Sequence, residues 1–188
     1  MRLRIVSSMF TAFLGVVLIQ HVALAADSNK KQEMLKRGEY LVGYGGCNDC
    51  HSPKLMTPKG PEPDPKRMLS GHPANLKLPE LPQGLIGPEK WGGLTTNDLT
   101  AWYGPWGVSY AANLTPDKKT GLGNWTADQF IKTMRTGKHL GVGRDLLPPM
   151  PWFSLAVLTD EDLKAVFAYL GSIKPIENMV PQPIPPKH

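Results

Sequence analysis

Cysteine is scarce in this chain. The 188 residues include only two cysteines, Cys47 and Cys50, and both belong to one five-residue stretch. No thiol is left to form a structural disulfide elsewhere in the fold. A zinc site built from two Cys/His pairs is also disfavoured, because such a site needs four ligands and no second pair exists.

Long apolar segments are missing after the first 25 residues. Residues 1–25 combine a basic start, an apolar stretch over 5–19 and small residues just before Ala26. This pattern predicts a signal peptide cleaved before Ala26. An uncleaved membrane anchor is the alternative, but the apolar stretch is shorter than the roughly 20 residues that a span needs. We therefore expect a periplasmic chain whose mature part has no transmembrane segment.

A strong excess of one charge is missing too. The formal net charge is +5, and two of the 21 basic residues are Arg2 and Arg4 in the expected signal peptide. Without them, 19 basic residues face 16 acidic ones, a net charge of +3. The lysines are scattered in a way typical of a solvated surface. This small excess gives no support for a nucleic-acid partner.

Glycine and proline are plentiful, with 19 of each. This composition predicts short helices joined by long ordered loops. Residues 52–92 are studded with prolines and show no periodicity, so we expect an extended loop there. Residues 175–188 hold five prolines and predict an extended tail that lies along the surface or is loose.

The two cysteines belong to the stretch Cys47-Asn48-Asp49-Cys50-His51. Cys-x-x-Cys-His is the attachment signature of a c-type haem. Its two thiols form thioethers with the porphyrin, and the adjoining histidine binds the iron. A thioredoxin-like redox pair is the alternative, but it requires a neighbouring βαβ pattern that this sequence lacks. The motif predicts one covalently attached haem c, held by Cys47, Cys50 and His51.

Three stretches have helical signals. Apolar residues recur at helical spacing over about 29–44. A second helix is expected between Thr126, which with Gln129 forms a capping-box pattern, and Gly137. A third is expected from the N-cap Thr159 to about Gly171. The aromatic residues of 94–112 are interpreted either as lining the haem cavity or as ordinary core.

The stretch between the last two expected helices contains the candidate for a second iron ligand. Met150 lies between Pro149 and Pro151, and this stiff setting suits a thioether held at a fixed distance from iron better than a flexible core methionine. Methionine ligation favours the ferrous state and raises the reduction potential. His72 is interpreted as exposed or hydrogen-bonded within its loop. The competing candidates are Met56, Met68, Met179, His72 and His139.

With these features, the chain resembles a class I c-type cytochrome, and in particular the monohaem modules found as cytochrome subunits or partners of periplasmic dehydrogenases. The resemblance covers nearly all of the chain after residue 25. It is carried by Gly38 and Tyr40, Cys47 to His51, Asn113-Leu114-Thr115-Pro116-Asp117, Gly121-Leu122-Gly123-Asn124-Trp125-Thr126, Pro149-Met150-Pro151-Trp152, and Leu158-Thr159-Asp160-Glu161-Asp162-Leu163 leading to Ala168-Tyr169-Leu170.

The resemblance implies an all-α cytochrome c fold over residues 26–174, in which the first and last helices cross with Gly38 opposite Tyr169. It also implies His51 and Met150 as axial ligands. Two features depart from the family: the haem motif occurs once, whereas multi-haem subunits repeat it, and the 52–92 loop is longer than in the smallest members.

The resulting expectation is a periplasmic electron carrier rather than an enzyme. It would transfer single electrons from a donor dehydrogenase to an acceptor cytochrome or oxidase in a respiratory chain. A haem-based sensor or a peroxidase-like enzyme is the alternative, and it requires an open iron site. A thiol-redox protein would instead keep Cys47 and Cys50 free.

Overall fold

The computed structural model describes residues 26–81 and 84–186. The expected signal peptide, residues 1–25, and the last two residues of the expected tail lie outside this part of the chain. Residues 26–44 form the N-terminal helix, which agrees with the helix expected over 29–44. After a turn at Gly45 and Gly46, the short helix α2 (Cys47–His51) follows.

Three further α-helices and a 3₁₀ helix follow in the second half of the chain. They are α3 (Ala127–Thr136), η1 (His139–Gly141), α4 (Trp152–Leu155) and α5 (Asp160–Ser172). The expected caps are present. Thr126 and Gln129 form a reciprocal capping box, and the hydroxyl of Thr159 accepts a hydrogen bond from the Asp162 amide. These local signals satisfy amide groups that a helix start otherwise leaves unpaired.

The N-terminal helix crosses α5 at Gly38. A Cβ at this position would overlap the Ala165 carbonyl and lie 2.8 Å from the Cβ of Tyr169. Only glycine allows this approach of the two backbones, so the crossing expected at Gly38 and Tyr169 is confirmed. A continuous apolar core surrounds it, made of Leu41, Val42, Leu69, Phe130, Ile131, Met134, Leu163, Val166 and Leu170.

The expectation of an all-α fold is wrong. Residues 54–110 contain two small antiparallel sheets, so the fold is mixed α/β. One sheet is the hairpin of β1 (Lys54–Thr57) and β2 (Gly60–Pro63). The other has the order β3 (Leu94–Thr95), β4 (Ala101–Gly104) and β5 (Gly107–Tyr110).

Both hairpins turn through two residues, the first of which is proline. Pro58-Lys59 joins β1 to β2, and Pro105-Trp106 joins β4 to β5. Proline favours the first inner position of such a turn, and Gly107 follows with a φ of 88° that other residues rarely adopt. The strands are two to four residues long, too short for an alternating pattern to stand out.

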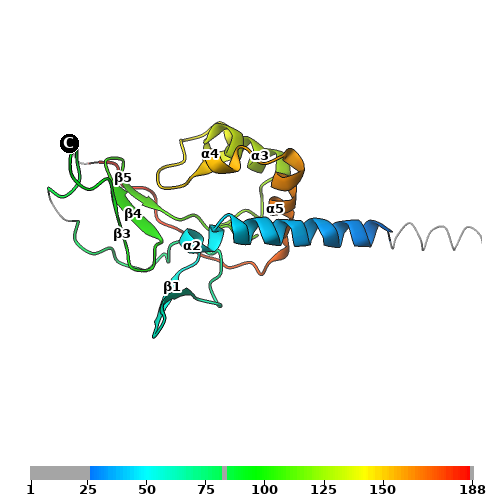
Figure 1. The fold of residues 1–188 in the computed structure, drawn as a ribbon, viewed down its shortest axis with the longest axis horizontal. Coiled ribbons are helices and arrows are strands. Elements are labelled where there is room, and N and C mark those ends of the chain that lie inside the picture. Colours follow the sequence, from blue (N-terminus) through cyan, green and yellow to red (C-terminus); the bar gives the residue numbers. More distant parts are fainter. Residues whose placement is uncertain (1–25, 82–83, 187–188) are drawn as a thin grey trace, which may run out of the picture.

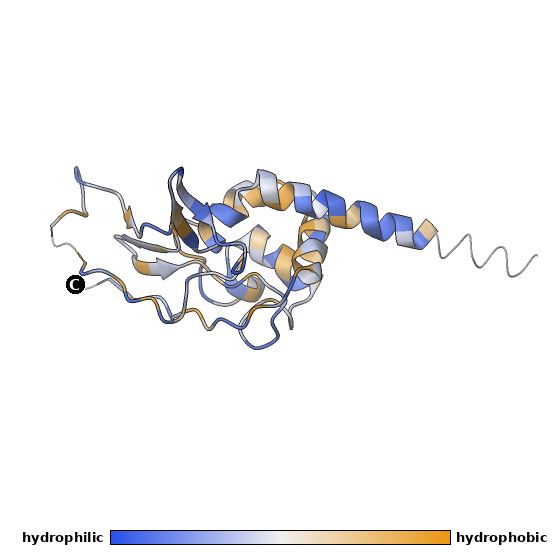
Figure 2. Ribbon diagram, turned by 90° about the horizontal axis from the view of Figure 1, so that it is seen from below, coloured by the Kyte–Doolittle hydropathy of each residue, from blue (hydrophilic) through white to orange (hydrophobic). Residues whose placement is uncertain are grey.

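The helices and the larger sheet lie at opposite ends of the molecule. In Figure 1 the helices gather where the N-terminal helix projects, while β3, β4 and β5 lie at the other end. Figure 2 shows that the projecting part of this helix is mostly hydrophilic. The C-terminal tail runs back from α5 to the sheet, where Ile184 and Val108 bond each other through both backbone amides. Within the described residues, no helix has both the length and the apolar character to cross a membrane.

Candidate functional site

Cys47, Cys50 and His51 lie on one short helix. Gly46, whose left-handed backbone conformation ends the preceding turn, comes directly before α2. Both cysteines are half-buried and are not joined to each other by a disulfide, and the side chain of Cys47 packs against the apolar core. One turn of helix therefore presents two thiols and an imidazole from a single rigid element.

His51 is buried and its ring is held in one orientation. Its Nδ1 atom lies 2.7 Å from the backbone carbonyl of Ala112. A carbonyl oxygen only accepts hydrogen bonds, so Nδ1 is the donor and the lone pair of the neutral ring is on Nε2. Burial lowers the pKa of His51. The His51 carbonyl also accepts a hydrogen bond from the Gly71 amide at 2.8 Å, which fixes the backbone beneath the ring.

Lys54 and Ser52 fasten the end of α2. The ammonium group of Lys54 donates to the carbonyls of Asn48 and Asp49, both at 2.9 Å, and to that of Ser52. Ser52 is completely buried, and its hydroxyl donates to Asn48 and accepts from the Leu69 amide. The Lys54 bonds satisfy carbonyls that such a short helix leaves open, and the Ser52 bonds join its end to Leu69.

Burial raises the pKa of both thiols, that of Cys47 to about 11. Reactive Cys-x-x-Cys pairs behave in the opposite way, because thiol–disulfide exchange requires a thiolate at neutral pH. The surroundings of these two cysteines are therefore unlike those of a thiol-redox centre.

Met150 is half-buried and packs against the same apolar core as Cys47. Its chain segment is held on both sides. The Leu146 amide donates to the Gly137 carbonyl at 2.7 Å, and Trp152 packs directly over the backbone of Gly137. The glycine that ends α3 thus also locates the methionine segment.

Four of the five competing candidates for a second ligand have surroundings that differ from those of Met150, and the fifth, Met68, is half-buried as Met150 is. Met56 and Met179 are largely exposed, at 72% and 63% of their surface. The ring of His139 stands edge-on to Trp125 at 5.1 Å. His72 is not exposed at all, and its Nδ1 lies 2.7 Å from the hydroxyl of Thr100. Both interpretations of His72 were therefore wrong: the side chain is completely buried, and its hydrogen bond reaches Thr100, outside the loop of residues 52–92.

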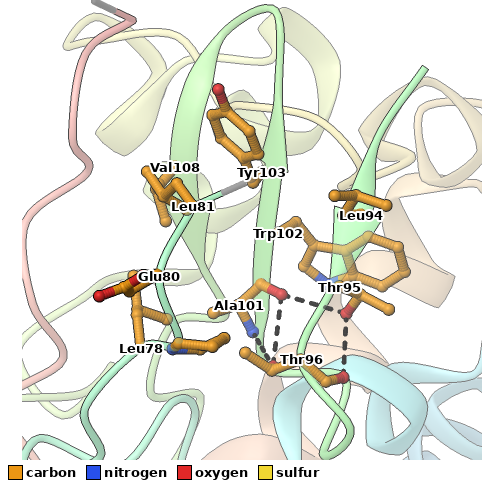
Figure 3. A pocket seen from close by; sticks show the side chains of 11 residues that line it. Leu78, Glu80, Leu81, Leu94, Thr95, Thr96, Ala101, Trp102, Tyr103 and Val108 are labelled. Atoms are coloured by element: carbon orange, nitrogen blue, oxygen red, sulfur yellow. Dashed lines mark hydrogen bonds between the residues drawn. The ribbon is translucent and has the colours of Figure 1, made fainter. Parts of the chain in front are cut away.

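The aromatic residues of 94–112 lie on or beside the three-stranded sheet. Trp102 and Tyr103 line a mostly apolar cavity of about 250 Å³ between this sheet and residues 78–81. Figure 3 shows the cavity, with Thr96 bonded to both the amide and the carbonyl of Ala101 at its base. In this structure these two side chains therefore border a cavity on the sheet.

Sequence reasoning missed several residues that support the site. Ala112 acts through its backbone carbonyl and Lys54 through contacts with α2, and neither role leaves a recognisable pattern. The hairpins did have a signal, a proline followed two residues later by glycine, at Pro58 to Gly60 and Pro105 to Gly107.

Several known proteins that are similar to this chain are named as cytochrome subunits of dehydrogenases. The chain is 35% identical over 147 residues to the gluconate 2-dehydrogenase cytochrome c subunit of Pantoea cypripedii, covering 78% of this chain and 25% of that protein. The chain is a homologue of dehydrogenase cytochrome c subunits. The resemblance inferred from the sequence motifs is thereby confirmed. No protein-family model matches the chain.

Two further homologues cover similar parts of the chain. A nicotinate dehydrogenase subunit of Pseudomonas putida is 30% identical over 79% of it, and the cytochrome c subunit of alcohol dehydrogenase (quinone) of Gluconobacter oxydans is 28% identical over 92%. The chain spans only 9% of the former and 29% of the latter. It therefore corresponds to one portion of these larger proteins.

Proposed function

We propose that this chain is a monohaem c-type cytochrome that transfers single electrons in the periplasm. A dehydrogenase would be its electron donor, and a downstream cytochrome or oxidase its acceptor. The proposal is supported by the homologous dehydrogenase cytochrome c subunits and by the Cys-x-x-Cys-His motif on α2. We infer an electron carrier without substrate turnover of its own.

Each residue of the site has a distinct role in this proposal. Cys47 and Cys50 would hold one haem c through two thioethers, and His51 and Met150 would bind its iron. When bound, the haem supplies a one-electron couple at its iron. Met150 as the second ligand would raise the reduction potential and leave no open position for a substrate.

The observation that carries the proposal is the hydrogen bond between His51 Nδ1 and the Ala112 carbonyl. Metal-binding histidines usually donate their other ring N–H to a carbonyl or carboxylate, which fixes the tautomer and the ring orientation. In His51 this bond leaves Nε2 as the nitrogen with the lone pair. The residues of α2 therefore have the chemistry that a covalently bound haem needs.

The optical spectrum of the purified protein tests this proposal. The wild-type protein is expected to keep its haem on a denaturing gel and to show a low-spin spectrum with a sulfur–iron charge-transfer band. Met150→Ala should lose this band while retaining the covalent haem. A potentiometric titration should fit a one-electron couple.

Met179→Ala is a matched control, because Met179 is a mostly exposed methionine in the tail, and it should keep the band. Absence of covalent haem would overturn the proposal as a whole. A charge-transfer band that survives in Met150→Ala would overturn only the assignment of the second ligand.

A further inference from the structure

The segment that contains Met150 cannot hold its own shape through backbone hydrogen bonds. Three of the four residues from Pro148 to Pro151 are prolines and have no amide hydrogen. The fourth, Met150, donates to the Leu147 carbonyl at a long 3.3 Å. A fixed position for Met150 therefore depends on donors from other parts of the chain.

Ser109 of β5 supplies one such donor. Its hydroxyl lies 2.5 Å from the carbonyl oxygen of Pro148, 39 residues away in sequence. The serine is 7% exposed, and its backbone is paired with Trp102 of β4. Because the sheet fixes the backbone of Ser109, the hydroxyl reaches Pro148 from a rigid support.

The direction of this hydrogen bond is determined by Trp106. The indole Nε1 of Trp106 lies 3.2 Å from the Ser109 hydroxyl oxygen, and an indole N–H only donates. The Pro148 carbonyl only accepts. The hydroxyl must therefore accept from Trp106 and donate its single proton to Pro148, so the three groups form a chain with one possible polarity.

Trp106 is itself held in place by the β4–β5 turn. A Cβ on Gly104 would overlap the indole ring, with the ring carbon Cε3 only 2.8 Å away. A Cβ on Gly93 would lie 3.3 Å from the same ring. The indole thus lies against two backbone segments where no side chain intervenes.

We propose that Ser109, oriented by Trp106, is a positioning residue for Met150. The three-stranded sheet then has a role in the site. Through Ser109 it holds the proline-rich segment at the Pro148 carbonyl, two residues before Met150. This inference rests on the proposed function, since it takes Met150 as an iron ligand.

Competition by imidazole tests the proposal, because imidazole added to the oxidised protein displaces a weakly held methionine from the iron. Ser109→Ala should bind imidazole about fivefold more tightly than the wild-type protein, which corresponds to the roughly 1 kcal/mol of one hydrogen bond. Its reduction potential should fall, because methionine ligation is what raises it. Trp106→Phe, which keeps an aromatic ring but removes the N–H, should change both quantities in the same direction.

Ser109→Thr retains the hydroxyl and should restore imidazole affinity close to the wild-type value. Ser154→Ala is a matched control, since this serine is exposed on α4, four residues after Met150, and should leave the affinity unchanged. The proposal is overturned if Ser109→Ala binds imidazole like the wild-type protein, or if Ser109→Thr binds it as tightly as Ser109→Ala.

Failure of the proposed function would look different. A Met150→Ala protein that binds imidazole no better than the wild-type protein would show that Met150 is not a ligand, whatever Ser109 does. If Met150→Ala binds imidazole tightly and Ser109→Ala does not, the haem assignment stands and only the role of Ser109 is rejected.

Discussion

His72 is joined to Asp98 through the hydroxyl of Thr100. Both hydrogen bonds are 2.7 Å long, and the imidazole is completely buried. The Thr100 proton goes to the carboxylate, so His72 Nδ1 must be the donor to Thr100. The buried Nε2 atom then has no hydrogen-bond partner within residues 26–81 and 84–186.

This arrangement predicts a stability that depends on the protonation of His72. Burial lowers the pKa of His72 below 6.5, and the nearby Asp98 carboxylate opposes this shift. The unfolded chain then binds the proton more readily than the folded one. The contribution of His72 is fully present above about pH 6.5 and is lost as the pH falls through the folded-state value.

His72→Asn keeps a donor for Thr100 but does not titrate. Its free energy of unfolding should therefore fall less than that of the wild-type protein between about pH 7.5 and pH 5, a range that includes the ordinary histidine pKa. Urea denaturation at several pH values measures this difference. Parallel pH profiles for the two proteins would show that His72 does not change protonation.

The helix crossing gives a second prediction. Gly38→Ala places a methyl group against the Ala165 carbonyl and Tyr169, so the N-terminal helix and α5 must separate. We expect a loss of at least about 2 kcal/mol in the free energy of unfolding, as for other overpacked cores. Gly171→Ala is the control, because no atom lies within 4 Å of its added Cβ. It should be neutral or stabilise by up to about 1 kcal/mol, and equal losses in both variants would contradict the close crossing.

A third prediction concerns the ion pair between the same two helices. Arg37 donates to both carboxylate oxygens of Asp162, at 2.8 and 3.0 Å. The hydrogen bond from Arg37 lowers the pKa of Asp162 below 3.8, so its stabilising effect is present above that pH and is lost in more acidic solution. Arg37→Ala should lower the free energy of unfolding slightly near neutral pH, and less in high salt, since the arginine is half-exposed and its attraction to Asp162 is screened by solvent.

Lys119→Ala provides the comparison for this pair. Lys119 and Glu177 are 3.4 Å apart and both are mostly exposed, so the loss of their attraction should be barely measurable. Chemical denaturation of both variants at low and high salt separates the two cases. A salt-independent effect of Arg37→Ala would point to lost packing instead of lost charge.

A fourth prediction concerns Asn178, which attaches the C-terminal tail to the body. Its amide nitrogen donates to the carbonyls of Ser70 and His72 at 2.7 and 2.9 Å, and its side-chain oxygen accepts from the Ala74 amide at 3.0 Å. Asn178→Asp keeps the acceptor but places a carboxylate against two carbonyls. We expect faster proteolysis of the tail and a loss of about 1–3 kcal/mol.

Limited proteolysis followed by mass spectrometry measures this effect. Asn124→Asp is a suitable control, because Asn124 is exposed and its side-chain amide donates to the nearby Lys118 carbonyl, six residues away. Cleavage within the tail, residues 175–188, should increase in Asn178→Asp and not in Asn124→Asp. Similar cleavage of both variants would show that Asn178 is not what fastens the tail.

Much of the helical part was predictable because its signals are local. The motif from Cys47 to His51, the capping box at Thr126 and the N-cap at Thr159 each involve residues within a single helical turn or its border. Such interactions form between neighbours in sequence, so a short window of residues contains both partners. The same is true of Met150 between its prolines, which remains a prediction.

The amino-acid sequence by itself determined the haem-attachment motif, the starts of α3 and α5 at their caps Thr126 and Thr159, and the glycine at the helix crossing. The tertiary structure alone decided that a sheet interrupts the helices and that Ser109 contacts Pro148. It also brought the Asn178 side chain within hydrogen-bond distance of the Ser70 carbonyl, 108 residues away in sequence. These contacts join groups far apart along the chain, and single serine or asparagine residues give no sign of their partners. Only the folded chain brings such groups within hydrogen-bond distance.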